Sequence, residues 1–469
     1  MTKRIAIIGA GPGGYVAAIR GAQLGGEIFL IEKNEVGGTC LNSGCIPTKT
    51  YFQNAKIMNY AKHSEEFGIS MENVSISGEK LLERKNGIVK NLVGGIEQLL
   101  KSYPNIELLR GTGKIIDKNN LVVELKDGEK REIEVDNIVI ATGSKPLMPD
   151  VLGMDLDEVI DSDALLEMDV IPEKLIVVGG GVVGLEFASI YQALGSQVVL
   201  LSSRILKDAD KEISKRMIPL LKKQGIELYN DIRATKIVKE DGVLKVTAAY
   251  KNKDEEIEVT GDYVLIAGGR GPVFQALGLD EIGIEYSNRG ISVRENFETS
   301  ISGIYAIGDV NGGVQLAHVA SAQGEFVMEH LLGDAGNKDF ENYPNCVFTL
   351  DEVAYVGRTE EELKEAGVEY KVSKANFASN GKSLAVGNIN GFVKVLGDED
   401  GKVLGVHIIG PEANLLIAEA TLAIANNLKV EDILKTIHAH PTLAETFTEA
   451  VAGIYDQAIH VAPSRRRKK

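Results

Sequence analysis

The sequence predicts an α/β protein with two similar halves and a C-terminal α+β domain. The same pattern occurs in residues 3–25 and 174–195: an apolar strand, a G-x-G-x-x-G turn and a helix. This order is typical of dinucleotide-binding folds. From about residue 341, alternating apolar segments and then helical runs follow without any such turn. We therefore predict two Rossmann-like dinucleotide-binding domains and a third domain of the α+β class.

Length and composition agree with this organisation. The chain has 469 residues, 44% of them hydrophobic and 25% charged, which suits a globular protein of about three domains. Its net charge of −16 argues against a general nucleic-acid binder. The basic run Arg465–Lys469 is the exception. We interpret it as a solvated tail, with docking to an acidic partner surface as the alternative.

The cellular location is predicted from three absences. The sequence shows no signal-peptide pattern at its start and no apolar run long enough to span a bilayer. Its three cysteines are too few for a structural disulfide framework. We expect a cytoplasmic protein without a membrane or nucleic-acid partner, and we predict no metal site.

The first glycine-rich turn predicts a nucleotide site. Gly9, Gly11 and Gly14 follow a buried-strand pattern and precede a helix, so backbone N–H groups can approach a pyrophosphate. A second strand, residues 27–31, ends at Glu32, 23 positions after Gly9, where a carboxylate can accept hydrogen bonds from a ribose. The alternative is a glycine-rich turn that only packs a helix on a strand.

Cys40 and Cys45 lie close together in the segment GGTCLNSGCIPTK, residues 37–49. Five residues of ideal helix rise about 7.5 Å, beyond the ~4.4–6.8 Å between alpha carbons that a disulfide tolerates. A bridge therefore needs irregular backbone, which Asn42, Ser43 and Gly44 can supply. A disulfide here would be catalytic in a reducing compartment, and the alternative is two inert buried thiols.

The first half then continues to a cofactor-facing strand. Residues 87–103 have the apolar spacing of a helix. From Ile106 the period changes to two, which predicts an antiparallel meander. The meander closes on the buried strand 137–143, whose small end at Thr142 and Gly143 permits close approach to a cofactor.

The second half repeats these elements. Gly179, Gly181 and Gly184 form the second turn, a second meander follows, and residues 262–268 repeat the closing strand. Two similar halves predict two dinucleotide sites, most economically one for flavin and one for a nicotinamide nucleotide.

The repeat fails at one informative position. Ser202 stands 23 positions after Gly179, where the first half has an acid, and Arg204 and Lys207 follow it. An acid there would accept from a ribose 2′-hydroxyl and repel a 2′-phosphate, so these residues permit NADP(H). NAD(H) binding through other contacts is the alternative, and we leave both open.

Two later segments carry candidate polar groups. A predicted strand within residues 298–309 ends at Asp309, a candidate acceptor for a cofactor hydroxyl or an ordinary turn residue. His440 precedes Pro441, and Glu445 follows five residues after the histidine. An imidazole is the natural proton carrier near neutral pH, and Glu445 could orient it and raise its basicity. A purely structural histidine is the alternative.

These segments together resemble the pyridine nucleotide–disulfide oxidoreductases over nearly the whole chain, most specifically through GGTCLNSGCIPTK and HAHPTLAE. The resemblance implies a homodimer in which Cys40 faces substrate, Cys45 contacts the flavin and His440 of the partner subunit is the base. It also implies that Lys49 lies near the flavin and pairs with Glu186. The cofactor-binding positions that it implies are Glu32, Lys49, Thr142, Gly143 and Asp309 for FAD, together with Gly269, Arg270 and Ala317.

The resemblance also implies domain boundaries: residues 1–150 and 273–340 for FAD, 151–272 for NAD(P), and 341–469 for the interface. Gly271 departs from the family, in which a second arginine often follows the residue equivalent to Arg270.

The implied activity is oxidation of protein-bound dihydrolipoyl groups by NAD(P)⁺ through FAD and a Cys40–Cys45 disulfide. No lipoyl domain is present in the sequence, so we expect a separate lipoyl-bearing protein as partner. This would be the acyltransferase of a 2-oxo acid dehydrogenase or the carrier protein of the glycine cleavage system. The alternatives are an NADPH-dependent reductase of a small, glutathione-like disulfide and a non-catalytic flavin-binding scaffold. A mercuric or selenium-type reductase is disfavoured because no cysteine follows Cys346.

Overall fold

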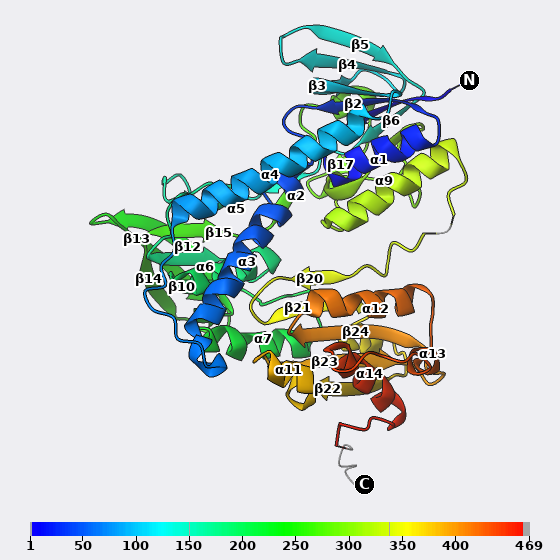
Figure 1. Ribbon diagram of the computed structural model, residues 1–469. Helices are drawn as coiled ribbons and strands as arrows, with labels where there is room; N and C mark the ends of the chain where they lie inside the picture. The colour runs from blue at the N-terminus through cyan, green and yellow to red at the C-terminus, as the bar shows by residue number, and fades with distance from the viewer. Residues whose placement is uncertain (1, 150, 337, 463–469) are drawn as a thin grey trace.

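The computed structural model describes residues 2–149, 151–336 and 338–462, and three large sheets organise them (Figure 1). The first sheet lies at the top of Figure 1, the second at the left and the third at the bottom, next to the C-terminus. The basic run Arg465–Lys469 lies outside the described residues. Among the helices within the described ranges, none is long and apolar enough to cross a membrane.

The first sheet has seven strands and combines parallel and antiparallel pairing. In spatial order they are β19 (Ile304–Ala306), β6 (Asn137–Ile140), β1 (Arg4–Ile8), β2 (Glu27–Glu32), β3 (Ile106–Ile115), β4 (Asn120–Leu125) and β5 (Lys130–Glu134). Helices α1 (Pro12–Gln23) and α9 (Ala317–Leu332) lie side by side against it (Figure 1). Gly13 and Gly324 allow this approach, since a Cβ on Gly324 would lie 2.5 Å from the carbonyl oxygen of Gly13.

The predicted meander is confirmed for β3, β4 and β5, and the structure adds a second role for β3. Its first half pairs in parallel with β2, and its second half pairs antiparallel with β4. The strand predicted within residues 298–309 is shorter than expected. Only β19 is regular, and Asp309 lies in the following 3-10 helix η2 (Gly308–Asn311).

The second sheet is parallel and carries its meander as a separate sheet. Its strands, in spatial order, are β11 (Glu227–Asn230), β10 (Gln197–Ser202), β9 (Lys174–Val178), β15 (Tyr263–Ile266) and β8 (Val159–Ile160). Strands β12 (Ile232–Glu240), β13 (Val243–Tyr250) and β14 (Glu256–Gly261) form the antiparallel meander. Helix α6 (Val182–Leu194) follows the second glycine-rich turn. A short pair, β7 (Ser144–Pro146) with β16 (Arg270–Pro272), joins the two halves.

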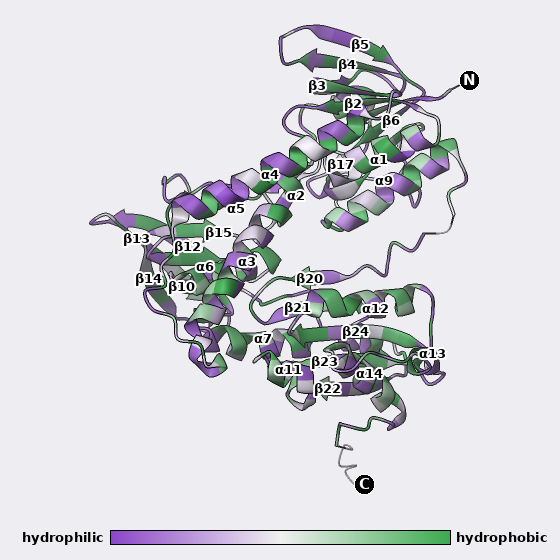
Figure 2. Cartoon of the chain, viewed as in Figure 1, coloured by the Kyte–Doolittle hydropathy of each residue, from purple (hydrophilic) through white to green (hydrophobic). Residues whose placement is uncertain are grey.

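The third sheet is antiparallel, as the alternating pattern predicted. It has the order β20 (Asn345–Val347), β21 (Glu352–Gly357), β24 (Val403–Gly410), β23 (Phe392–Gly397) and β22 (Lys371–Asn376). Helices α12 (Ala413–Ala425) and α14 (Ala444–Ala452) pack against it and share its core. The strand β24 is largely hydrophobic in Figure 2 because both of its faces are covered.

The remaining elements connect these layers. Helix α4 begins nine residues before the predicted start at residue 87, because Ser77 caps it by accepting a hydrogen bond from the Lys80 N–H at 3.3 Å. Hydrophilic and hydrophobic residues alternate along this helix (Figure 2). The helices not yet given are α2 (Gly38–Asn42), α3 (Cys45–Lys62), η1 (Ser64–Phe67), α4 (Gly78–Lys101), α5 (Ser162–Leu166), α7 (Lys211–Lys223), α8 (Leu279–Ile282), α10 (Glu360–Glu365), η3 (Phe377–Ser379), α11 (Gly381–Ala385), α13 (Val430–Leu434) and η4 (Gly453–Tyr455). The remaining strands, β17 (Tyr286–Ser287) and β18 (Gly290–Ile291), form a short hairpin.

A buried ion network ties the second and third sheets together. The Lys394 ammonium on β23 is 1% exposed and lies 2.9 Å from a carboxylate oxygen of Asp210 and 2.6 Å from Glu360. The Asp210 side chain, itself 0% exposed, also caps α7 by accepting from the Glu212 N–H. Removing the cation would leave carboxylates in a site with little water, which is costly.

Candidate active site

The cysteine segment has the irregular backbone that the spacing predicted. Cys40 lies within the short helix α2, and Cys45 is the first residue of α3. Between them Ser43 has a φ of −139°, and Gly44 has a φ of −137° and a ψ of −110°. This break brings the two sulfur atoms into hydrogen-bond contact, which continuous helix would prevent.

Both cysteines are in the thiol form, and their environments differ. The pKa of Cys45 is lowered to about 7, first by the hydrogen bond from the Cys40 thiol and then by the positive charge of Lys49. The pKa of Cys40 is raised, chiefly because its proton is held in that hydrogen bond and also by burial. The pair therefore holds its first negative charge on Cys45 and its proton on Cys40.

Lys49 is fixed beside the cysteines by a buried carboxylate. Its ammonium lies 2.8 Å and 3.0 Å from the two oxygens of Glu186, which is on α6 and 3% exposed. It also lies 4.4 Å from the ring centroid of Phe348, whose backbone N–H donates to Glu186 at 3.0 Å. The structure thus joins the Lys49–Glu186 pair, and Phe348 fixes the carboxylate.

One cavity of about 2410 Å³ joins the cysteines to both glycine-rich turns. Cys40, Cys45 and Lys49 line it together with residues of both turns. The other sequence-predicted residues on its wall are Gly9, Gly11, Glu32, Thr142, Gly143, Gly181, Glu186, Lys207, Gly269, Arg270, Asp309 and Ala317. Residues from both halves of the chain therefore share one continuous site.

The first glycine-rich turn fits a dinucleotide. Gly9 has a φ of +105°, and a Cβ there would lie 2.4 Å from the carbonyl oxygen of Ala141. A Cβ on Gly14 would lie 1.8 Å from the carbonyl oxygen of Gly9, so only glycine allows the turn to fold this tightly. Glu32 accepts from the Ala10 N–H at 2.7 Å, which holds its carboxylate beside the turn and at the cavity wall. These features suit a pyrophosphate and a ribose.

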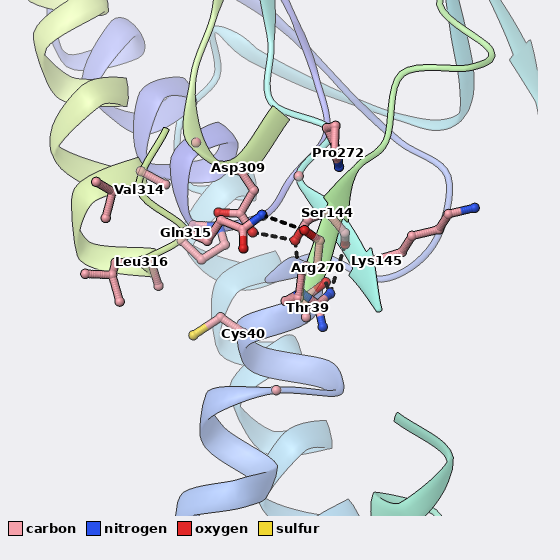
Figure 3. Close-up of a pocket in the computed structure, with 18 of the residues that line it drawn as sticks. Thr39, Cys40, Ser144, Lys145, Arg270, Pro272, Asp309, Val314, Gln315 and Leu316 are labelled. Atoms are coloured by element: carbon pink, nitrogen blue, oxygen red, sulfur yellow. Dashed lines mark hydrogen bonds between the residues drawn. The ribbon is translucent and has the colours of Figure 1, made fainter. Parts of the chain in front are cut away.

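Asp309 belongs to a polar chain that crosses from one half to the other (Figure 3). Its carboxylate accepts from the Ser144 hydroxyl at 2.5 Å, and that hydroxyl accepts from Arg270 Nε at 2.9 Å. The Arg270 guanidinium also donates to the Ser144 carbonyl at 2.9 Å and to Thr39 at 3.4 Å. Arg270, predicted on the nicotinamide side, is thus directed toward Asp309.

Gly271, which stands where the family often has a second arginine, lies beside the exposed side chain of Leu147. A Cβ on Gly271 would lie 2.7 Å from Leu147 Cδ2. The leucine follows β7, which pairs with the strand that contains Gly271. The Leu147 side chain is 47% exposed and can turn aside, so packing alone does not require glycine at this position.

The second glycine-rich turn has the same form as the first. Gly179 has a φ of +135°, and a Cβ there would lie 2.3 Å from the Ala267 carbonyl oxygen. A Cβ on Gly184 would lie 2.0 Å from the Gly179 carbonyl oxygen. Ser202 ends β10 beside this turn and is fully buried, with its hydroxyl accepting from the Arg204 N–H at 3.1 Å. The position that holds Glu32 in the first half therefore carries no charge in the second.

His440 and Glu445 form a pair outside this cavity. His440 Nδ1 lies 2.9 Å from one carboxylate oxygen of Glu445. The other carboxylate oxygen of Glu445 accepts a hydrogen bond from the Thr442 N–H at 2.9 Å. These contacts lower the pKa of Glu445, the Thr442 N–H having the larger effect. The imidazole is 79% exposed and does not line the cavity of its own chain. Its second nitrogen, which has no hydrogen bond to any described residue, can therefore reach another molecule.

Comparison with known proteins identifies the family. The model of the pyridine nucleotide-disulphide oxidoreductases matches residues 3–324, and the model of their dimerisation domain matches residues 343–451. The mitochondrial dihydrolipoyl dehydrogenase of Bos taurus is 41% identical over 95% of this chain and 89% of its own length. That of Pisum sativum is 39% identical over 97% and 92%. The chain belongs to the pyridine nucleotide-disulphide oxidoreductases.

Solved structures agree with this membership. The chain resembles LpdA from Mycobacterium tuberculosis with a TM-score of 0.89 and 26% identity, covering 97% of this chain and all of that one (100%). It resembles an HOCl-induced flavoprotein disulfide reductase from Escherichia coli with a TM-score of 0.85 and 26% identity, covering 96% and 99%. The predicted fold class is confirmed, and so are the predicted cofactors, because this family uses FAD and a pyridine nucleotide.

Sequence reasoning missed three residues that contact the predicted site residues. Ser144 connects Arg270 to Asp309, Thr39 accepts a hydrogen bond from Arg270, and the Phe348 backbone N–H holds Glu186. Ser144 and Thr39 each adjoin a segment already singled out, ATG and GGTC, so their neighbourhood was a signal. No sequence signal pointed to Phe348, because its backbone N–H contacts Glu186, a residue 162 positions away.

Proposed function

We propose that this chain oxidises protein-bound dihydrolipoyl groups to the lipoyl disulfide and reduces a nicotinamide nucleotide. The observation that carries the proposal is the thiol pair at the cavity, in which Cys45 has a pKa of about 7 and Cys40 keeps its proton. A pair poised in this way can alternate between a disulfide and a thiol–thiolate. The named activity of the dihydrolipoyl dehydrogenases, to which the chain is about 40% identical, supports this substrate.

In the oxidised enzyme a substrate thiolate attacks Sγ of Cys40. A bond forms between the substrate sulfur and Cys40, the Cys40–Cys45 bond breaks, and Cys45 leaves with the electron pair as a thiolate. Its low pKa makes Cys45 the better leaving group, and Lys49 stabilises its charge. The second substrate thiolate then attacks the first substrate sulfur, which releases the lipoyl disulfide and expels Cys40 with the electron pair. Cys40 becomes a thiol by taking a proton back from the protonated base.

His440 of the partner subunit is the proposed base. Thiolate attack requires removal of a proton from the dithiol, and an imidazole accepts it near neutral pH. Glu445 holds Nδ1 at 2.9 Å, which leaves Nε2 to take the substrate proton. The match of residues 343–451 to a dimerisation domain supports a homodimer in which this exposed pair meets the cavity of the other chain.

The resident cofactor would be held by the first glycine-rich turn, Glu32 and Asp309. Bound FAD supplies the two-electron carrier between the thiolate pair and the nicotinamide. Glu32 holds the turn through the Ala10 N–H, Lys49 keeps a positive charge beside Cys45, and Glu186 keeps that lysine in place.

The finer predictions extend this proposal. We propose a separate lipoyl-bearing protein as partner, from a 2-oxo acid dehydrogenase or the glycine cleavage system, and a cytoplasmic location. We also propose domain boundaries at residues 1–150, 151–272, 273–340 and 341–469. The return of β19 and α9 to the first sheet supports the two-part FAD domain.

An anaerobic titration of the flavin-loaded protein with dihydrolipoamide tests the proposal. We expect a long-wavelength thiolate–flavin absorbance to appear and to disappear when NAD⁺ or NADP⁺ is added. Cys45→Ser should abolish it, whereas the matched control Cys346→Ser should keep it, because Cys346 is not part of the pair. No spectral change with dihydrolipoamide, together with reduction by NADPH, would instead favour a reductase of another disulfide.

A further inference from the structure

The end of strand β10 is the clearest difference between the two nucleotide cradles. In the first half, Glu32 presents a carboxylate to the cavity beside the glycine-rich turn. In the second half, Ser202 takes the corresponding place, and its hydroxyl would lie 1.9 Å from a Cβ on Gly180. A neutral, buried serine at this position lacks the carboxylate that would accept a hydrogen bond from a ribose 2′-hydroxyl and repel a 2′-phosphate.

Three cations surround this strand end. The loop after Ser202 folds against the turn, with the Leu206 N–H donating to the Gly180 carbonyl at 2.9 Å, and it carries Arg204 and Lys207. Lys251 approaches from the end of β13 and donates to the Ser203 carbonyl at 3.2 Å.

Arg204 is exposed, and within the described ranges its guanidinium has no hydrogen bond or ion pair. Lys207 is 72% exposed at the cavity wall, and among the described residues its ammonium has a single ion-pair contact, with Asp208 at 4.0 Å.

Two carboxylates lie in the same region. Asp208 faces Lys207, and Asp231 accepts from the Asn230 side chain at 2.9 Å. Neither one takes the place of Ser202 beside the glycine-rich turn. Glu341, Glu362 and Glu365 line the same cavity as Lys207. The guanidinium of Arg204, which has no carboxylate partner among the described residues, can form a bidentate contact with a phosphate.

We propose that this cradle selects NADP(H) over NAD(H), with Arg204 and Lys207 recognising the 2′-phosphate. The inference rests on the proposed function for the reaction that it completes. One dihydrolipoyl dithiol and one NADP⁺ give one lipoyl disulfide, one NADPH and one proton. The dithiol loses two electrons and two protons, of which the nucleotide takes both electrons and one proton as hydride.

Binding of nucleotide fragments to the flavin-loaded holoenzyme tests this without turnover. Calorimetry should show adenosine 2′,5′-bisphosphate binding at least about ten-fold more tightly than 5′-AMP, equivalent to about 1.4 kcal/mol. Raising the salt concentration several-fold should weaken binding of the bisphosphate more than binding of 5′-AMP, because salt screens the interactions of exposed charges. Equal affinities, or tighter binding of 5′-AMP, would overturn the proposal.

Variants separate recognition from a general charge effect. Arg204→Gln should weaken the affinity for the bisphosphate about three- to ten-fold and change the affinity for 5′-AMP less than two-fold. Lys126→Gln removes the same charge from an exposed turn between β4 and β5 in the first sheet and should change neither affinity. Equal losses in Arg204→Gln and Lys126→Gln would count against recognition by this loop.

Turnover distinguishes the two proposals. Dihydrolipoamide oxidation with a kcat/KM at least about ten-fold higher for NADP⁺ would support both. Efficient oxidation with NAD⁺ and little with NADP⁺ would refute this inference and keep the proposed function. No dithiol oxidation with either nucleotide, alongside selective bisphosphate binding, would refute the proposed function and keep the nucleotide preference.

Discussion

Lys49 and Glu186 form one ion pair, yet their removal should shift the pKa of Cys45 in opposite directions. Lys49 lowers this pKa through its positive charge, and Glu186 raises it through its negative charge. Lys49→Met removes the stabilising charge and leaves the buried carboxylate uncompensated. Glu186→Gln keeps an amide oxygen for the Phe348 N–H and leaves the ammonium without its neutralising partner.

The magnitude follows from the lowered pKa. At about 7, against an ordinary value of 9.0, Cys45 is roughly half ionised at neutral pH. The Cys40 hydrogen bond is the larger cause and survives in both variants, and water in the cavity screens the lysine charge. We therefore expect Lys49→Met to raise the pKa of Cys45 to about 8, leaving about a tenth ionised at pH 7. Glu186→Gln should lower it to about 6.5.

An anaerobic pH titration of the reduced, flavin-loaded protein measures this shift through the long-wavelength thiolate–flavin absorbance. The midpoint should move up in Lys49→Met and down in Glu186→Gln, and the double variant should fall between them. Cys346→Ser serves as the background, so that only the pair contributes thiols. Midpoints that move in the same direction, or do not move, would refute the electrostatic account of Cys45.

Three further predictions concern the base, the ion network and the second cradle. His440→Gln should lower dihydrolipoamide oxidation about 10²–10⁴-fold and leave NAD(P)H oxidation by an artificial acceptor unchanged, and equal losses in the two assays would contradict its role as base. Lys394→Met should lower the free energy of unfolding by roughly 3–5 kcal/mol, because Asp210 would stay buried without its cation, and an unchanged urea midpoint would contradict this. Gly184→Ala should abolish nucleotide binding but keep the flavin, because its Cβ would lie 2.0 Å from a carbonyl oxygen of the turn, whereas the unobstructed helical Gly87→Ala should keep both and change stability by no more than about 1 kcal/mol.

Local patterns made much of this architecture predictable. Glycine spacing after an apolar strand fixed both nucleotide turns, since a Cβ at Gly14 or Gly184 would collide with a carbonyl oxygen within the same turn. The five-residue cysteine spacing required a break in the helix, and Ser43 and Gly44 form it. In each case the controlling contact joins residues close together in the chain, so residue type and spacing carry the information.

Only the tertiary structure decided where long-range partners meet. It gave β3 two different neighbours and directed Arg270 toward Asp309 through Ser144. The family resemblance had already paired Lys49 with Glu186, 137 residues away, but only the structure showed that Glu186 opposes the lysine's effect on the Cys45 pKa. Such contacts depend on how whole sheets pack, and no periodicity or local spacing records them. The sequence by itself therefore determined the cradles and the redox pair, and the packing of the three sheets determined the electrostatic environment in which that pair ionises.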